Sequence, residues 1–367
     1  MATTQSKSFI IACGGTGGHL FPGISVAQEM KRRGHSVLLL VSEKAIDQRA
    51  LEGHPDLESR QMAMTGKPKT LSSAMLSFIV KFWKAKRACA KLIKEMKADA
   101  VLGMGGFTSM PPIMAARGLG IPTFIHESNA IPGKANKLTA KYCSAVFLGM
   151  EACRHHFANN TCHVVGTPVR ESLRGPVDRE KSLAHFQLDP HTPTMLVMGG
   201  SQGASGLNKA VCDALPELDG ESLQVIHLTG ADEEAKVREA YEKCGMKAHV
   251  AGFCDRMDDA LAVSEMAICR SGASSLSELA YFGIPSILIP YPYAAEDHQT
   301  FNAKPYVDGG AAILCREKDL SGPDLAAQVR EKFLDRAERG EMQRKMKDFS
   351  SDSANIKICD IMDSQTS

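Results

Sequence analysis

The chain has 367 residues, of which 44% are hydrophobic and 23% charged, and its formal net charge is +1. This length predicts two domains of about 100–200 residues each, the composition is typical of a soluble globular protein, and the near-zero charge gives no reason to expect a nucleic-acid partner. The eleven cysteines form no C-x-x-C pair and no cluster at metal-ligand spacing, which favours buried thiols in a reducing cytosol.

Short apolar runs alternate with helical stretches along the whole chain. Continuous runs of this length are typical of parallel strands buried on both faces, and strand–helix alternation predicts doubly wound α/β sheets. Two series of six runs predict two such domains, residues 1–166 and 167–342, with a last segment, 343–367, that packs back on the first domain. The runs are residues 9–12, 37–41, 100–103, 123–126, 145–148 and 163–165, then 195–198, 224–228, 249–253, 266–269, 286–290 and 312–314.

A first glycine-rich loop, residues 14–18, lies between the first run and a helix that we expect to begin near Phe21. Glycines let a backbone approach a phosphate closely. The loop is not the dinucleotide fingerprint, because Leu20 stands where that motif needs glycine, although Glu43 after the second run keeps a nicotinamide cofactor open as an alternative. His19 is a candidate general base because an imidazole titrates near neutral pH; the alternative is a histidine that only caps the loop.

Residues 71–97 form a basic, amphipathic stretch. From Lys67 to Lys97 nine Lys and Arg residues stand against the single acid Glu95, a local charge of +8 that leaves −7 for the rest of the chain. An apolar face with a lysine rim is typical of a helix in an anionic membrane interface; the alternative is a surface helix with solvated lysines. No stretch approaches the roughly 20 apolar residues of a membrane span, and residues 1–8 lack a signal peptide's apolar region, so we expect a cytoplasmic protein. The candidate membrane-contacting residues are Met75, Ile79, Lys81, Phe82, Trp83, Lys84 and Arg87.

Further polar turns follow later strands of the first half. Residues 103–107 follow the third run and form a second candidate phosphate cradle, and residues 126–129 end the fourth run, where ligand-binding side chains collect in open α/β sheets. Glu127 in this turn is the alternative general base. Arg170, beside a hinge expected at residues 166–168, is placed to face a diphosphate.

The second half repeats the pattern of strand, polar turn and helix. Residues 199–204 form a third glycine turn. The stretch 269–302 contains two neighbouring strand-to-helix turns, with a helix expected from Ala273 to Phe282 and closed by Gly283. Free N–H groups and the helix dipole make the turn at residues 271–272 an anion site, while Glu278 and Gln299 are suited to sugar hydroxyls. Three glycine turns spread over both domains predict a cleft that handles two phosphate-bearing ligands.

Together and in this order, these motifs resemble the MurG family of peptidoglycan N-acetylglucosaminyltransferases from about Ile10 to Ala303. The resemblance implies a GT-B glycosyltransferase with two Rossmann-like domains facing a cleft. It implies inverting transfer from UDP-N-acetylglucosamine to lipid I, undecaprenyl-diphospho-N-acetylmuramoyl-pentapeptide, which gives lipid II, at the cytoplasmic face of the bacterial inner membrane. The enzyme would be peripheral, on an anionic phospholipid surface. The motifs are residues 14–19, 103–106, 126–129, 168–170, 199–204, 270–273 and 297–299.

Site roles follow from the resemblance motif by motif. His19 would be the base, with Glu127 as the alternative, and Gly105 and Gly106 would seat the lipid diphosphate. Cys254 would contact the uracil through its backbone, although the family usually has a larger aliphatic residue there. The donor-binding residues would be Thr16, Gly17, Gly18, Asn129, Arg170, Ser201, Cys254, Ser271, Gly272, Glu278 and Gln299.

Whether the reaction needs a metal ion depends on what stabilises the negative charge of the leaving diphosphate. Helix N-terminal amides and Arg170 can stabilise it, and no Asp-x-Asp motif follows a strand, so we predict transfer without a metal ion or cofactor. Three alternatives stay open: a related GT-B enzyme such as a lipid glucosyltransferase or an epimerase, a non-catalytic nucleotide-sugar sensor, and a nicotinamide-dependent oxidoreductase.

Overall fold

Seven parallel strands form the sheet of the first half of the chain, in the order β3-β2-β1-β4-β5-β6-β7. The computed structural model describes residues 6–62, 73–200 and 203–366. It divides into two units, unit 1 (Met1–Glu171 with Ser351–Ser367) and unit 2 (Ser172–Ser350). The strands of unit 1 are β1 (Ser8–Ala12), β2 (Ser36–Val41), β3 (Glu58–Gln61), β4 (Ala100–Gly103), β5 (Thr123–Glu127), β6 (Ala145–Leu148) and β7 (Cys162–Val164).

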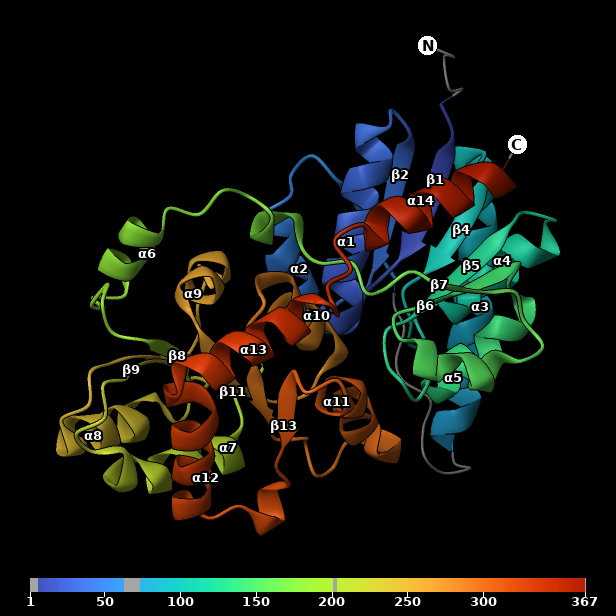
Figure 1. Ribbon diagram of the computed structural model, residues 1–367. Helices are drawn as coiled ribbons and strands as arrows, with labels where there is room; N and C mark the ends of the chain where they lie inside the picture. Colours follow the sequence, from blue (N-terminus) through green and yellow to red (C-terminus); the bar gives the residue numbers. More distant parts are fainter. Residues whose placement is uncertain (1–5, 63–72, 201–202, 367) are drawn as a thin grey trace. The chain divides into compact units, whose positions relative to one another are not determined.

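Helices cover both faces of this sheet (Figure 1). Alternate residues of β1 enter different cores: Phe9 and Ile11 pack with α1 and α14, whereas Ile10 and Ala12 pack with α3 and α4. Two separate cores are what a parallel sheet buried on both faces requires. The helices of unit 1 are α1 (Gly17–Arg32), α2 (Ala45–Glu52), α3 (Ser73–Met96), α4 (Met110–Gly118), α5 (Lys134–Thr139) and α14 (Ala354–Gln365), with 3-10 turns at Ala140–Tyr142 and Glu151–Phe157.

Unit 2 has a six-stranded parallel sheet in the order β10-β9-β8-β11-β12-β13, and Phe333 and Val197 belong to a core on one face of it. Its strands are β8 (Thr194–Met198), β9 (Gln224–Leu228), β10 (Ala248–Ala251), β11 (Met266–Cys269), β12 (Ser286–Leu288) and β13 (Ala312–Leu314). Its helices are α6 (Arg179–His185), α7 (Ser205–Ala214), α8 (Glu234–Cys244), α9 (Met257–Val263), α10 (Ala273–Phe282), α11 (His298–Asp308), α12 (Gly322–Gln328) and α13 (Arg336–Lys347), with a π-helix at Val329–Leu334.

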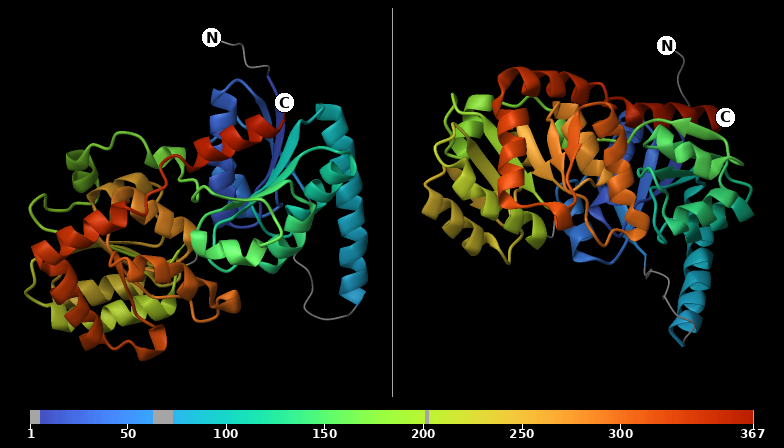
Figure 2. Two further views of the ribbon diagram at one scale, coloured as in Figure 1. Left: turned by 45° about the vertical axis from the view of Figure 1, so that its right-hand side comes forward. Right: turned by 60° about the horizontal axis from the view of Figure 1, so that its bottom comes forward.

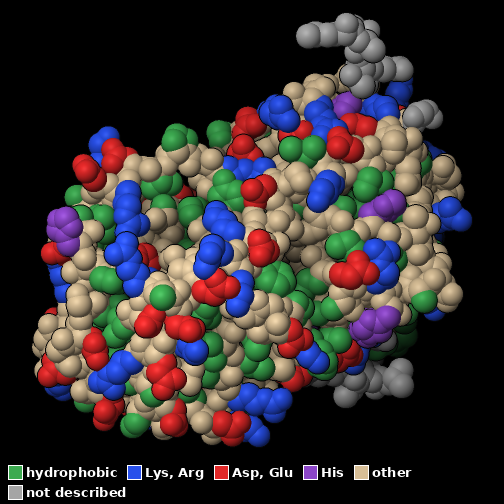
Figure 3. All heavy atoms as spheres, viewed as in Figure 1, with side chains coloured by type: hydrophobic (Ala, Val, Ile, Leu, Met, Phe, Trp, Pro, Cys, Tyr) green, Lys and Arg blue, Asp and Glu red, His purple; other side chains and the backbone are tan. Residues whose placement is uncertain are grey.

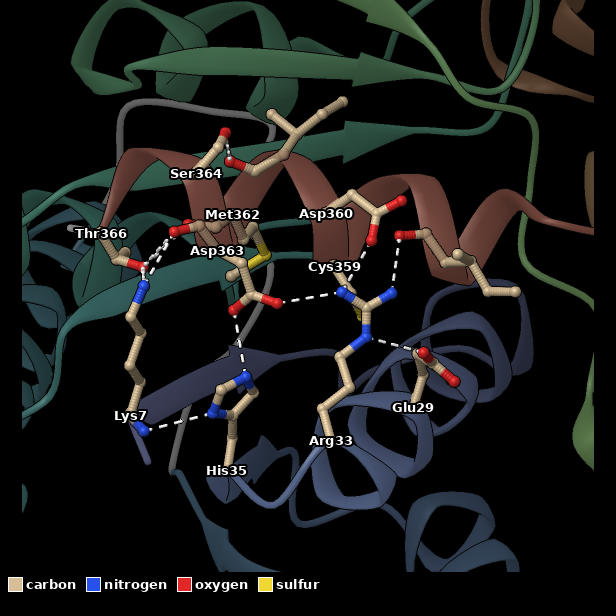
Figure 4. A network of polar contacts seen from close by, with 12 residues as sticks. Lys7, Glu29, Arg33, His35, Cys359, Asp360, Met362, Asp363, Ser364 and Thr366 are labelled. Carbon is tan, nitrogen blue, oxygen red and sulfur yellow. Dashed lines mark hydrogen bonds and ion pairs between the residues drawn. The ribbon is translucent and has the colours of Figure 1, made fainter. Parts of the chain in front are cut away.

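The last helix returns to unit 1, where it lies along α1 (Figure 1). Asp363 on α14 accepts from Arg33 at 2.9 Å, its other oxygen lies 3.1 Å from Nε2 of His35, and its carbonyl accepts from Nζ of Lys7 at 2.8 Å (Figure 4). These contacts join the two ends of the chain within unit 1.

The predicted fold class, two doubly wound parallel α/β domains, is confirmed. Three details differ. The units divide after Glu171 rather than after residue 166, and the segment that returns to unit 1 begins at Ser351 rather than at residue 343. Helix α1 begins at Gly17, not near Phe21, because the Thr16 carbonyl already accepts from the backbone N–H groups of His19 and Leu20.

Candidate functional site

The first two glycine turns of unit 1 are locked to each other. Oγ1 of Thr108 donates to the Gly14 carbonyl at 3.0 Å and joins the two turns, while Oγ of Ser109 donates to the Gly105 carbonyl at 2.8 Å within the second turn. Gly105 has a φ of +119° and Gly106 a φ of +74°, backbone conformations that favour glycine. The turns after β1 and β4 therefore form one surface at the carboxyl ends of adjacent strands, where open α/β sheets bind ligands.

His19 lies between these two turns, in the first turn of α1. Its Nδ1 lies 3.2 Å from Oγ1 of Thr16, and a Cβ added to Gly105 would stand 2.8 Å from its Nε2. Burial lowers the pKa of His19 to about 4, although the Asp47 carboxylate acts in the opposite direction. The imidazole is therefore neutral at neutral pH, the state in which it can accept a proton.

The carboxylate of Glu127, at the end of β5, is already saturated with hydrogen bonds. Oε1 accepts from the backbone N–H and the side-chain amide of Asn129, both at 2.9 Å. Oε2 accepts from the backbone of Gly133 at 3.0 Å and from Nδ2 of Asn136 at 2.7 Å. Because these four bonds use the acceptor capacity of a buried carboxylate, the geometry favours His19 over Glu127 as the base.

Arg170 stacks on an aromatic ring in the last part of unit 1. Its guanidinium carbon lies 4.6 Å from the ring centroid of Phe21 on α1. This cation–π contact holds the arginine beside the helix that begins with Gly17 and Gly18, after the N-cap Thr16.

In unit 2, the turn between β11 and α10 is tied to the start of α11. Oγ of Ser271 donates to the Gln299 carbonyl at 2.8 Å, and Nδ2 of Asn302 donates to the Ser271 carbonyl at 3.2 Å. Gly272 is the N-cap of α10, so the positive end of the helix dipole lies beside this pair of turns. The structure thus brings Ser271, Gly272 and Gln299 together, and Glu278 lies on α10 with 9% of its surface exposed.

Arg270 connects the carboxyl ends of three strands of unit 2. Its Nη1 donates to the carbonyls of Ile289 and Pro290, each at 3.0 Å, and its Nη2 contacts Oε2 of Glu317 at 2.5 Å. The next backbone N–H, that of Tyr291, donates to Oε1 of Gln299 at 2.9 Å. Arg270 therefore fixes the loop that holds the Gln299 side chain.

The two remaining candidate residues of the donor site are Ser201 and Cys254. Ser201 falls outside the described residues. Cys254 is half-buried and follows Phe253, which is 66% exposed. No group of three or more His, Cys, Asp or Glu side chains within residues 6–62, 73–200 and 203–366 could hold a metal ion. The metal-independence of the reaction stays a prediction.

The sequence reasoning gave no role to Asp47, Asn136 or Asn302, which contact the predicted residues. Asn136 lies on α5, and a Cβ on Gly105 would be 3.3 Å from its Nδ2. The positions of these residues depend on chain crossovers, and no local pattern in the sequence marks them.

These two units, with glycine turns and helix N-termini at the carboxyl ends of parallel strands, define a two-domain α/β glycosyltransferase of the GT-B class. Residues 9–148 match the N-terminal domain and residues 194–356 the C-terminal domain of glycosyltransferase family 28. The chain belongs to this family.

Curated relatives cover almost the whole chain. The chain is 38% identical over 345 residues to the UDP-N-acetylglucosamine–N-acetylmuramyl-(pentapeptide) pyrophosphoryl-undecaprenol N-acetylglucosamine transferase of Citrifermentans bemidjiense, covering 91% of this chain and 93% of that protein. The protein of the same name from Myxococcus xanthus is 38% identical over 333 residues, covering 88% and 83%.

Solved structures show the same architecture. The crystal structure of Acinetobacter baumannii MurG superposes with a TM-score of 0.76 at 28% identity, covering 97% of this chain and 99% of that one. The UDP-GlcNAc 2-epimerase of Neisseria meningitidis, bound to UDP-GlcNAc, has a TM-score of 0.70 at 11% identity over 96% and 98% of the chains, a likeness of fold alone.

Proposed function

We propose that this protein transfers N-acetylglucosamine from UDP-N-acetylglucosamine to undecaprenyl-diphospho-N-acetylmuramoyl-pentapeptide. The observation that carries this proposal is the match to relatives with that activity in their name, at 38% identity over 91% of the chain. The matched domains, residues 9–148 and 194–356, contain both the His19 cluster and the turn at Ser271 and Gly272.

In this proposal unit 1 takes the lipid-linked acceptor and unit 2 takes the UDP-sugar. Gly105 and Gly106 lie beside His19, where residues without side chains leave room for the acceptor diphosphate. The turn before α10 offers helix N-terminal amides to the donor diphosphate, while Glu278 and Gln299 serve the ribose and the sugar. Arg170 lies outside both family-matched ranges, so its contact with the donor rests on the motif alone.

His19 acts as the general base in the transfer. It takes the proton of the acceptor C4 hydroxyl as the oxygen attacks C1 of N-acetylglucosamine from the face opposite the leaving group. The bond from C1 to the UDP oxygen breaks, and UDP leaves with the electron pair. The new link is β-1,4, with the configuration at C1 inverted. Amides of the Ser271–Gly272 turn stabilise the diphosphate as its negative charge grows.

Helix α3 supplies the contact with the lipid surface. Figure 2 shows that its N-terminal end extends beyond the sheet of unit 1. Leu76 is 70% exposed, Val80 53% and Trp83 50%, an unusually apolar surface for a helix in water. Among the predicted membrane residues, Met75 and Phe82 are half-buried, and Ile79, Lys81, Lys84 and Arg87 are exposed.

The exposed apolar face of α3 is flanked by basic side chains, and the helix contacts the turn at Gly105 and Gly106. Nζ of Lys86 lies 4.9 Å from the Trp83 ring, and the rings of Phe78 and Phe107 meet edge to face with centroids 6.1 Å apart. Phe107 directly follows Gly106, so α3 contacts the turn assigned to the lipid diphosphate. On the face drawn in Figure 3, by contrast, acidic and basic side chains are interspersed. None of the described helices has the length and apolar composition of a membrane span.

Charge reversal tests this surface. Replacing Lys81, Lys84 and Arg87 by Glu should lower the affinity for phosphatidylglycerol vesicles about 100-fold or more, because each basic residue contributes about 1 kcal/mol near an anionic bilayer. The affinity is measured by co-sedimentation. A matched control reverses three exposed lysines of unit 2, Lys209, Lys236 and Lys243. Equal vesicle binding by both triple variants would refute the α3 surface.

The transfer itself is tested by UDP release with and without a short-chain analogue of the lipid-linked acceptor. We expect release that depends on the acceptor and that stops when UDP-N-acetylglucosamine is replaced by UDP-glucose. Acceptor-independent conversion of the donor sugar would indicate an epimerase. Tight UDP binding without turnover would indicate a nucleotide-sugar sensor, and either result overturns the proposal.

A further inference from the structure

The connection between β2 and α2 holds one peptide of the first glycine turn from both sides. The Gly15 N–H donates to Oδ2 of Asp47 at 2.8 Å, and Nζ of Lys44 donates to the Gly15 carbonyl at 2.7 Å. Gly15 has a φ of +111°, a conformation that favours glycine. Two charged side chains of opposite sign thus fix the turn that leads directly into the first turn of α1 and His19.

The Asp47 carboxylate is fully buried, and the hydrogen bonds shown by the structure come from neutral donors. Oδ2 also accepts from the backbone N–H of Ser42 at 3.0 Å and from its hydroxyl at 2.5 Å. Oδ1 is buried and has no hydrogen-bond partner among the described residues. A neutral amide oxygen could accept the same three bonds without the cost of burying a charge. The charge itself therefore needs a reason beyond holding the turn.

His19 is the group on which this charge can act during the reaction. His19 is half-buried, so the imidazolium that it becomes on taking a proton is only partly solvated, and a nearby carboxylate lowers the free energy of that cation. Asp47 raises the pKa of His19, whereas Lys44 lowers it. His126, which interacts electrostatically with His19, is neutral at neutral pH because burial lowers its pKa to about 4.

We propose that Asp47 is a positioning residue for the transfer: it fixes the Gly15 turn and stabilises the imidazolium that His19 becomes when it takes the acceptor proton. Lys44 fixes the same peptide from its other side but opposes the imidazolium. This inference rests on the proposed function, with His19 as the base.

The proposal predicts that variants of Asp47 and Lys44 shift the pKa of His19 in opposite directions. In protein labelled with ¹⁵N-histidine and titrated by NMR, Asp47→Asn should lower the pKa of His19, and Lys44→Met should raise it by a measurable fraction of a unit. A His19→Gln variant assigns the resonance among the twelve histidines. Ser42→Ala is the matched control, because it removes one hydrogen bond to Asp47 and leaves both charges in place.

Kinetics add a readout that a purely structural role would not give. Asp47→Asn should lower kcat about tenfold, with the KM values for donor and acceptor nearly unchanged, because the charge acts on the protonated base rather than on bound substrate. Ser42→Ala should keep most of the kcat of the parent protein.

The outcomes separate the inference from the function on which it rests. Shifts of the His19 pKa in opposite directions, with kcat lowered only by Asp47→Asn, support the proposal. Shifts in the same direction, or none, overturn it even in an active transferase. If Asp47→Asn does not fold, Lys44→Met decides: an unchanged or lowered His19 pKa overturns the proposal. Absence of transferase activity in the unmodified protein refutes the proposed function, and the pKa shifts are still measurable.

Discussion

Gly105→Ala is the substitution that most directly tests the position of His19. The new Cβ would lie 2.8 Å from Nε2 of His19, whereas ordinary contacts begin at 3.4 Å, so the ring must retreat by about 0.6 Å. A displacement of about 1 Å in a reacting group can cost about 100-fold in rate. We therefore expect kcat to fall about 10- to 100-fold. The positive φ at Gly105 adds a stability loss of about 1–2 kcal/mol.

Gly120→Ala is the matched control for backbone strain. Gly120 has a φ of +76°, and a Cβ there meets nothing within 4 Å. Both variants should lose free energy of unfolding in urea, because both place a side chain at a positive φ. Only Gly105→Ala should lose kcat when UDP release is measured with saturating donor and acceptor. Equal kcat values in the two variants would refute the placement of the base beside Gly105.

Three further predictions concern pH and the donor site. The acid limb of kcat/KM should lie near pH 4 rather than near 6.5, because His19 must be neutral and burial lowers its pKa; a limb at 6.5 would exclude it as the base. Glu317→Gln should raise the KM for the UDP-sugar several-fold and leave the Kd for UDP unchanged, because the ion pair with Arg270 supports the loop that holds Gln299; parallel changes in both constants would contradict this. Burial also lowers the pKa of His126 to about 4 in the folded protein. Between pH 6.5 and 4 the unfolded chain therefore binds more protons than the folded protein does. Stability should therefore fall by about 3 kcal/mol over that window in denaturant titrations, and His126→Gln should remove this part of the slope.

The sequence predicted twelve of the thirteen strands in the described residues because those strands are buried and apolar. Strand β3 was missed, since Glu58–Gln61 reads Glu-Ser-Arg-Gln and all four residues are exposed at the edge of the sheet. An edge strand of this kind takes its conformation from backbone pairing with β2, and side-chain hydrophobicity gives no sign of it.

Helix ends were predicted well where capping chemistry decides them. Helix α10 begins and ends at the predicted residues, Ala273 and Phe282, and Gly283 closes it with a φ of +71°. The start of α1 was placed too late, because Gly17 and Gly18 read as loop residues although they form the first helical turn. The last helical stretch is two helices, separated by residues 348–353, which are polar apart from Phe349.

The glycine turns of the candidate site were predictable because each follows a strand and precedes a helix. The residues that support them were not. Asp47 contacts Gly15 across 32 positions of sequence, and Thr108 contacts Gly14 across 94. Such contacts form because the strands that carry these residues are neighbours in the sheet. No local pattern in the sequence shows which strands become neighbours.

The most direct test of the account is the transfer of radiolabelled N-acetylglucosamine from its UDP donor to a short-chain analogue of undecaprenyl-diphospho-N-acetylmuramoyl-pentapeptide, with the isolated product analysed by NMR. We predict a labelled disaccharide product with a β anomeric coupling, and a loss of about 100-fold or more in kcat for His19→Ala with UDP affinity retained. Tight binding of the donor without label in the acceptor, or a product with the α configuration, would contradict the account.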